Sequence, residues 1–357
     1  MSEATEAEGE SASPARTLRP EFNGSAGEYF RVWVVNLLFS LVTLGIYSAW
    51  AKVRKKKYLY GNTRLDGDSF DYFARPEAIL RGRIVAVAVL LVYAFAGQLY
   101  PESRYALWGV AAIAAPWVIV RSLLFSARNS AWRGLRFHFN GTPGGAARVF
   151  LGLLAVTVVT LGLAYPWFVA RRRRYVLANH ALGASRFGCE VSTGSFYWVY
   201  LRAALMWIGL MVPLGALMYL TVILAVIPSL SHASFGPVVI AFLPVIGGYA
   251  AYLAVYGYVQ ARTTNLLWNG AYGPGLRFAS DLRAWKLIRI YFGNVLAAVL
   301  SVGLLIPWAV VRTLKYRLSC LAVIVEQETV HEADPAYARV GATGEELGDF
   351  FNLDLGI

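Results

Sequence analysis

Charged residues are scarce in this chain. They make up 15% of its 357 residues, while hydrophobic residues make up 57%. A soluble domain normally carries about a quarter of its residues as Asp, Glu, Lys or Arg. A deficit of this size over a chain of this length excludes an ordinary soluble globular protein. The composition therefore predicts an integral membrane protein.

Groups that carry catalysis or hold metals are also few. Cys189 and Cys320 are the only cysteines, too few for a disulfide framework, and the four histidines show no ligand spacing. Asp66, Asp68 and Asp71 flank a glycine but lack the twelve-residue calcium-loop pattern. No phosphate-binding glycine loop, nucleophile elbow or redox pair is found. We therefore expect no enzyme activity, no metal and no cofactor.

Acidic residues are concentrated at the two ends. The segment 1–18 and the segment 327–357 read as a disordered acidic leader and tail around a single membrane domain, 19–326. That domain is strongly basic, which suits the anionic lipid headgroups of a cytoplasmic leaflet. It has no stacking motif or basic helix-turn-helix, so we expect no nucleic-acid partner. No Asp or Glu lies deep in an apolar run, which argues against proton- or sodium-coupled transport.

Seven apolar runs approach the roughly 20 residues needed to cross a bilayer. They lie at about 29–50, 81–99, 105–126, 147–170, 200–227, 236–260 and 286–310. The segments between them are rich in glycine, arginine and aromatic residues. Some alternate polar and apolar residues, which predicts short β-hairpins on the membrane face.

The chain repeats itself. Shifted by 117 residues, 22–70 matches 139–187 at 17 of 49 positions, and a more diverged third copy follows near 291. This predicts three repeat units, at about 19–72, 136–189 and 277–325. Two pairs of transmembrane helices, at about 81–126 and 200–260, separate them. The predicted fold is an all-α polytopic membrane protein whose repeat units contain broken or re-entrant helices.

Two stretches carry a resemblance to a known family. "FNGSAGEYFRVWVVNLLFSLVTLGIYSAWAKVRKKKYLYGNTRLDGDSF" resembles the signature of the YjgN-like family of bacterial inner-membrane proteins. "RVFLGLLAVTVVTLGLAYPWFVARRRRYVLANHALGASRFG" is similar to the second half of that signature. The resemblance implies a multi-pass location in the bacterial inner membrane. It implies no activity, because the family is one of unknown function.

Each unit places a helix break before a basic cluster. Gly and Pro close together break or kink a helix, and tryptophan favours the membrane–water boundary. The break motif consists of Thr43, Gly45, Trp50, Thr160, Gly162, Pro166, Trp167, Gly303, Pro307 and Trp308. The cations expected to meet lipid headgroups are Lys52, Arg54, Lys55, Lys56, Lys57, Arg171, Arg172, Arg173, Arg174, Arg312 and Lys315.

Two topologies remain open at this stage. If all seven runs cross the membrane, Lys52–Lys57 and Arg171–Arg174 lie on opposite faces, against the tendency of basic residues to stay inside. If each repeat unit turns back at its break, only four helices cross, and nearly every Lys and Arg lies on the cytoplasmic side. Three re-entrant units must then pack together against the four spans, because exposed non-helical backbone is not tolerated in lipid.

Function is indicated only in outline. The leading hypothesis is a transporter or channel-like protein for a small solute or lipid. The alternative is a structural or lipid-organising protein that binds anionic headgroups through its basic face. Asn36 and Asn294 occupy the same repeat position inside apolar runs. They are either hydrogen-bonding contacts between helices or polar elements of a substrate path.

Overall fold

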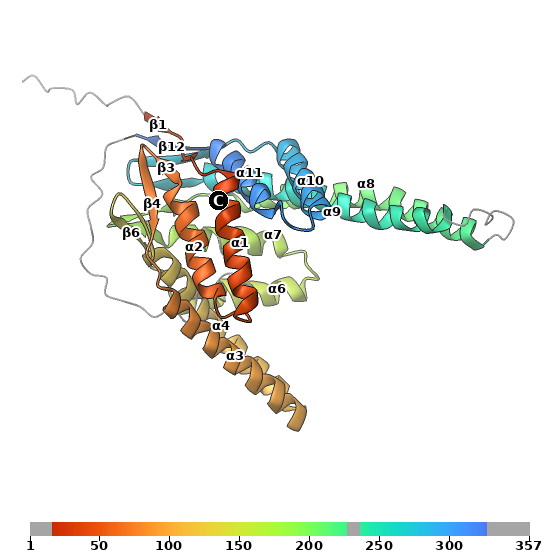
Figure 1. Ribbon diagram of the computed structural model, residues 1–357, viewed down its shortest axis with the longest axis horizontal. Helices are drawn as coiled ribbons and strands as arrows, with labels where there is room; N and C mark the ends of the chain where they lie inside the picture. Colours follow the sequence, from red (N-terminus) through yellow and green to blue (C-terminus); the bar gives the residue numbers. More distant parts are fainter. Residues whose placement is uncertain (1–15, 227–235, 327–357) are drawn as a thin grey trace, which may run out of the picture.

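Four long apolar helices dominate the computed structural model, which describes residues 16–226 and 236–326. They form two antiparallel pairs, α3 with α4 and α8 with α9 (Figure 1). Their bounds are Pro76–Leu99, Ser103–Arg128, Thr193–Val226 and Gly236–Asn269. All four are long and apolar enough to cross a membrane. They occupy the two places where the sequence predicts helix pairs.

Three shorter helical hairpins occupy the segments between and beside these pairs. We call them hairpins 1, 2 and 3. Hairpin 1 joins α1 (Ala26–Val42) to α2 (Ser48–Gly61), and hairpin 3 joins α10 (Ala284–Leu300) to α11 (Ile306–Ser319). The outgoing arm of hairpin 2 has three consecutive parts, and α7 is its returning arm. These elements are α5 (Pro143–Ala146), the π-helix η1 (Ala147–Gly152), α6 (Leu153–Val159) and α7 (Tyr165–Ala178).

Local sequence explains where the hairpins begin. Ser25 forms a capping box with Glu28: its hydroxyl accepts from the Glu28 N–H at 3.1 Å, and its own N–H donates to the Glu28 carboxylate. Thr142 caps the first turn of hairpin 2 by accepting from the Gly145 N–H at 3.1 Å. The returning arms α7 and α11 carry Pro166 and Pro307 in the first turn, where a missing N–H does no harm.

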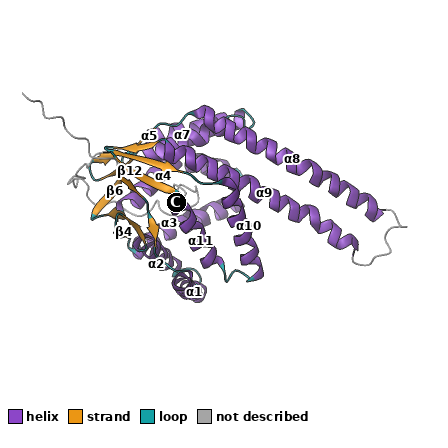
Figure 2. Ribbon diagram, turned by 90° about the horizontal axis from the view of Figure 1, so that it is seen from above, coloured by secondary structure: helices purple, strands orange, loops and turns teal. Residues whose placement is uncertain are grey.

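Twelve short strands form two antiparallel sheets at one end of the molecule (Figure 2). The five-stranded sheet has the order β1-β12-β11-β10-β9, and the seven-stranded sheet runs from β2 to β8 in sequence order. The strands of the first sheet are β1 (Arg16–Leu18), β9 (Gly188–Cys189), β10 (Ala271–Gly273), β11 (Leu276–Ser280) and β12 (Leu321–Val325). The strands of the second are β2 (Glu21–Phe22), β3 (Thr63–Leu65), β4 (Asp68–Tyr72), β5 (Ser130–Trp132), β6 (Leu135–Phe139), β7 (His180–Leu182) and β8 (Ser185–Arg186).

The two ends of the described chain come together in both layers. Strand β1 pairs with β12, with Arg16 opposite Val325, so the first and last strands of the described chain are neighbours. Among the helices, α1 of hairpin 1 packs against α11 of hairpin 3. Phe22 and Tyr29 meet Val311 and Leu318 there in one buried cluster. The helices therefore form a ring in sequence order. The helix pairs extend away from the end that holds the strands (Figures 1 and 2).

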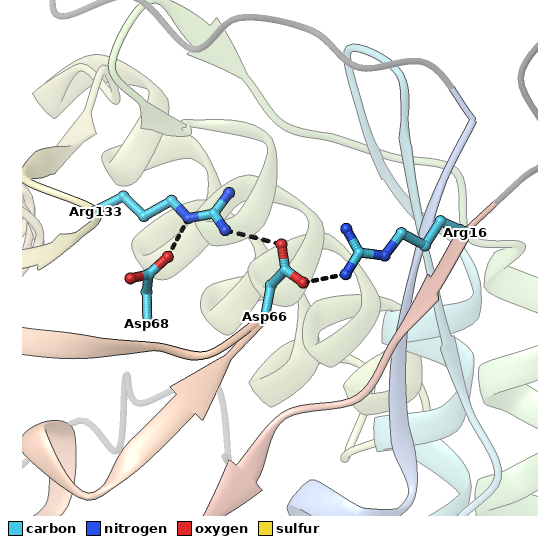
Figure 3. Close-up of polar contacts among 4 residues, drawn as sticks. All are labelled: Arg16, Asp66, Asp68 and Arg133. Atoms are coloured by element: carbon cyan, nitrogen blue, oxygen red, sulfur yellow. Dashed lines mark hydrogen bonds and ion pairs between the residues drawn. The ribbon is translucent and has the colours of Figure 1, made fainter.

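Ion pairs tie the N-terminal strand to the neighbouring sheet (Figure 3). Arg16 on β1 contacts Asp66 at 2.6 Å, and Arg133 contacts Asp66 at 2.8 Å and Asp68 at 2.5 Å. Asp66 and Arg133 lie in two neighbouring β-turns and have positive φ angles, 55° and 50°. The two carboxylates that flank Gly67 thus pair with arginines, in keeping with their lack of a calcium-loop pattern.

The structure differs from the sequence-based expectation mainly in its strands. The sequence predicts short separate β-hairpins, but their edges join into two sheets, so the fold is helical with a substantial β layer. Residues 16–18, within the segment expected to be an acidic leader, form β1. The rest of that leader, 1–15, and the expected acidic tail, 327–357, lie outside the described residues.

Candidate functional site

The three hairpins turn by the same backbone motif. In each, the outgoing helix ends in a Schellman motif, closed by a six-to-one and a five-to-two hydrogen bond. In hairpin 1 the Gly45 N–H donates to the Ser40 carbonyl at 2.7 Å, and the Leu44 N–H donates to the Leu41 carbonyl at 3.2 Å. The matching six-to-one bonds of hairpins 2 and 3 are made by Gly162 and Gly303, at 2.8 and 2.7 Å.

The left-handed residue of each turn is a large aliphatic one. Leu44, Leu161 and Val302 have φ angles of 49°, 49° and 50°. This conformation costs a non-glycine residue about 1–2 kcal/mol, and it is a clear outlier for a β-branched residue such as valine. Nevertheless, these side chains are 94%, 94% and 92% exposed. In water, an exposed aliphatic side chain gains no burial energy that could offset the backbone strain. An apolar environment around the tips therefore explains the choice of leucine and valine better.

The polar groups of each tip are satisfied within the tip. The Thr43 hydroxyl donates to the Phe39 carbonyl and accepts from the Tyr47 N–H, at 2.7 and 2.9 Å. Thr160 makes the same two kinds of bond in hairpin 2, and Ser301 accepts from the Leu305 N–H at 2.9 Å in hairpin 3. Backbone inside a bilayer must be satisfied internally. These bonds meet part of that demand within each tip.

A tyrosine fastens the open end of each hairpin. The hydroxyl of Tyr58 donates to the carbonyl of Ser25 at 2.9 Å, and Tyr175 donates to Thr142 at the same distance. The hydroxyl of Tyr316 donates to the carbonyl of Arg283 at 3.2 Å in hairpin 3. Each bond joins the end of the returning helix to the N-cap of the outgoing helix. The two arms are therefore held together at both ends.

The remaining break-motif residues lie where the hairpins reverse. Thr43 and Thr160 are the C-caps of the outgoing helices, and the three glycines directly follow the left-handed residues. Trp50, Trp167 and Trp308 are each the third residue of a returning helix. The break predicted from Gly and Pro is thus a full reversal of the chain.

The predicted cations lie on the three returning helices. Lys52 to Lys57 are on α2, Arg171 to Arg174 on α7, and Arg312 and Lys315 on α11. The structure keeps the three clusters on separate hairpins. The exposed members are Arg54, Lys55, Lys57, Arg171, Arg174 and Lys315, and the half-buried ones are Lys52, Lys56, Arg172, Arg173 and Arg312.

Each outgoing helix adds an arginine that the site prediction missed. Arg31, Arg148 and Arg289 are exposed and lie at matching distances from their tips. Helical rise places each of them about 16 Å from the last residue of its outgoing helix. That length is about half of the roughly 30 Å hydrocarbon core of a bilayer. The recurrence of Arg31 as Arg148 under the 117-residue shift was the signal that could have identified them.

In hairpin 3 the two arms enclose a basic groove of about 540 Å³. Lys286 and Arg289 come from α10, and Arg312 and Lys315 come from α11. The Lys286 ammonium lies 4.7 Å from the centre of the Tyr316 ring, and the Arg312 guanidinium lies 4.9 Å from that of Trp308. The groove therefore combines four cations that come from both arms. Its complete lining is Lys286, Arg289, Ile290, Arg312, Lys315, Tyr316 and Ser319.

The two asparagines that the sequence predicts to lie within the membrane bond within their own hairpins. The Asn36 amide donates to the Ala51 carbonyl at 3.4 Å. The Asn294 amide donates to the Ala309 carbonyl at 3.3 Å and to the Thr313 hydroxyl at 2.8 Å. Both contacts join an outgoing arm to its returning arm. This geometry matches the interhelical contact expected of a buried amide.

Comparison with known proteins supports a membrane protein. The family described as "Bacterial protein of unknown function (DUF898)" matches residues 17–350. "Inner membrane protein YjgN" of Salmonella typhimurium is 31% identical over 122 residues, which cover 33% of this chain and 30% of the relative. The protein of the same name from Escherichia coli O157:H7 is 28% identical over 150 residues, 40% of this chain and 36% of the relative.

These alignments span only about a third of the length of the curated relatives. No solved structure matches the chain. The names of the relatives and the four apolar helices together place the chain in the bacterial inner membrane. Because the family match, 17–350, covers the whole of the membrane domain 19–326, the chain belongs to the DUF898 family of bacterial proteins of unknown function.

Proposed function

We propose that this protein organises lipid in the cytoplasmic leaflet of the inner membrane. The two helix pairs cross the bilayer, giving four spans. Hairpins 1, 2 and 3 are copies of one module, and each enters from the cytoplasmic side, reaches about the middle of the bilayer and returns. The basic residues of both arms then hold anionic headgroups.

The observation that carries this proposal is the exposed aliphatic residue in the left-handed position of each tip. Leu44, Leu161 and Val302 accept backbone strain at sites that favour glycine or asparagine. Lipid around the tips favours apolar side chains at these three positions. The half-bilayer length between the outgoing arginines and the tips fits the same arrangement.

The distribution of charge supports one-sided insertion. With four spans, the turn between α3 and α4 faces the periplasm, and the three basic hairpins face the cytoplasm. Seven crossings would put either Lys52–Lys57 or Arg171–Arg174 outside. Four spans therefore follow the positive-inside tendency and seven do not.

Lipid organisation is favoured over solute transport by the contacts of the two asparagines. A substrate path needs polar groups that face a passage. The amide nitrogens of Asn36 and Asn294 instead bridge the arms of their hairpins. The contacts of these amide nitrogens support an interhelical role for both asparagines, and the exposed cations of the three hairpins support the lipid role.

Cysteine labelling tests the topology. Cysteines introduced at Arg64, exposed on β3, and at Ala184, exposed in the turn between β7 and β8, are expected to react only from the cytoplasm. A cysteine at Glu102, in the turn between α3 and α4, is expected to react only from the periplasm. Seven crossings would expose one of the first two sites to the periplasm instead.

The labelling background needs one change, Cys320→Ala. Cys189 is buried on β9, and its burial raises the pKa of its thiol to about 11. Because the thiolate is the reactive form, Cys189 labels slowly at neutral pH while the protein stays folded. It therefore serves as an internal control, since rapid labelling of Cys189 marks unfolded protein.

Neutralising one hairpin tests the lipid role. The double substitution Arg171→Gln and Arg174→Gln removes two exposed charges from α7. At about 1 kcal/mol per charge, it is expected to weaken binding of anionic lipid to this hairpin by roughly 30-fold. The measurement is energy transfer to a fluorescent phosphatidylglycerol in phosphatidylcholine nanodiscs, from a donor dye on a cysteine introduced at Ala184. Arg186→Gln, an exposed arginine on β8, is the matched control. Equal binding by the double variant and the wild type would contradict the proposal.

A further inference from the structure

We propose that the groove between α10 and α11 is a specific binding site for the phosphate group of one anionic lipid. This inference rests on the proposed function. It adds to that function a single site and the chemistry of its ligand. The groove is lined by Lys286, Arg289, Arg312 and Lys315, and no carboxylate lines it. Four cations brought together repel one another, and a bound phosphate removes that repulsion.

The cations are positioned without ion pairs. Within residues 16–226 and 236–326, none of the four pairs with a carboxylate. Lys286 and Arg312 instead lie over the faces of Tyr316 and Trp308. An aromatic face orients a cation and leaves N–H donors available to an oxygen ligand.

A glycine lets one arginine approach the opposite arm. Arg312 on α11 lies against α10 at Gly293, where the β-carbon of any larger residue would come within 2.8 Å of Nη1. The missing side chain thus allows the guanidinium into the groove between the arms. A guanidinium there offers a forked pair of donors, which suits the geometry of phosphate.

Comparison of the three hairpins separates the groove from general surface charge. Counted from the tips, Lys286 corresponds to Gly145 in hairpin 2 and to Glu28 in hairpin 1. The Glu28 carboxylate lies 3.2 Å from the Tyr58 hydroxyl, so hairpin 1 supplies its own anion beside the matching tyrosine. Hairpin 3 has a cation there instead. Lys286 thus adds a further positive charge to the groove of hairpin 3, where hairpin 1 carries a negative one.

The depth of the groove selects a lipid as the source of the phosphate. Arg289 lies about 16 Å from the tip, at the level where headgroups meet the hydrocarbon in the proposed insertion. Exposed apolar residues cover α10 between the groove and the tip, including Leu296, Val299 and Leu300. A phosphate held at Arg289 can therefore keep its acyl chains against this apolar face.

The test measures protection of a cysteine placed in the groove. Ser319→Cys, in a Cys320→Ala background, puts a thiol in the groove lining. The reaction rate with N-ethylmaleimide is measured in phosphatidylcholine nanodiscs that contain increasing phosphatidylglycerol. We expect the rate to fall as the anionic lipid fills the groove. Lys286→Glu, a change of two charges, is expected to raise the lipid fraction needed for protection by roughly 30-fold, and Lys286→Gln by roughly fivefold.

Two further variants keep the test decisive. Arg186→Glu changes the net charge equally at an exposed site on β8, and it should leave protection unchanged. Glu28→Lys, combined with Gly61→Cys at the matching place in hairpin 1, should create protection that the Gly61→Cys protein lacks. If Lys286→Glu and Arg186→Glu weaken protection equally, or if Glu28→Lys creates none, the site is overturned in favour of diffuse surface charge.

Inorganic phosphate distinguishes the two sources of the ligand. Protection by millimolar inorganic phosphate that exceeds the protection by phosphatidylglycerol would overturn the lipid assignment. Weaker protection by inorganic phosphate is the expected result. The hairpin 2 variant Arg171→Gln with Arg174→Gln separates this inference from the broader proposal. If that variant loses lipid while Lys286→Glu does not, the specific site fails and the lipid-organising role stands.

Discussion

Leu161→Asp is expected to destabilise the membrane-inserted protein by up to about 3 kcal/mol, the cost of a charge near the centre of a bilayer. Leu161 is the left-handed tip residue of hairpin 2 and is 94% exposed. Aspartate suits a left-handed backbone better than leucine does. The substitution therefore relieves strain in the turn, and any loss of stability must come from the surroundings of the side chain.

Whether Leu161→Asp lowers or raises the stability of the protein therefore tests the surroundings of the tip. If the tip of hairpin 2 lay in water, Leu161→Asp would be neutral or stabilising. The measurement is thermal unfolding in phosphatidylcholine nanodiscs, together with the yield of inserted protein. Leu161→Asn is the matched control, because it offers the same backbone preference without a charge and should lose much less stability. A variant as stable as the wild type would exclude tips that reach the hydrocarbon.

Local sequence predicted the helices well because length and apolarity are local properties. Runs of adequate length at 81–126 and 200–260 became the pairs α3–α4 and α8–α9. The break at Thr43-Leu44-Gly45 was also visible, since glycine near the end of a helix is a strong signal. Gly45 is itself left-handed, with a φ of 91°, but that Leu44 before it would also take a positive φ, of 49°, was not predictable. The usual preference for glycine there is outweighed by a need for an apolar tip.

The β layer shows the limit of local signals. Some of the short strands were suggested by polar and apolar alternation, but the pairing of β1 with β12 joins residues about 300 positions apart. Such a contact depends on the helical ring bringing the two ends together. The groove of hairpin 3 likewise depends on residues that the fold, and not the local sequence, brings together. Arg312 and Lys315 stood out within a recognisable motif, whereas Lys286 and Arg289 join them only because α10 and α11 reverse at Val302-Gly303.

Tyr29→Ala is expected to cost about 3–5 kcal/mol, as is usual when a large buried aromatic side chain is removed. Tyr29 on α1 is 3% exposed and stacks on Tyr58 at 5.4 Å between ring centres. Its cluster includes Val311 and Leu318 of α11, so it lies where the last hairpin meets the first. The cavity left by alanine would weaken the contact that closes the ring of helices.

Hydrogen exchange should show where the ring opens. In Tyr29→Ala, the amides of β1 and β12 are expected to lose protection first, because their pairing depends on the same closure. Tyr29→Phe keeps the packed ring and should cost less than about 1.5 kcal/mol. Leu287→Ala removes a fully buried residue at the matching position of hairpin 3, within a cluster between α9 and α10. It should destabilise the protein without exposing β1 and β12 selectively. If Tyr29→Ala loosened α3 and α4 before β1 and β12, closure through α1 and α11 would be wrong, and the two sheets would have to hold the ends of the chain together by themselves.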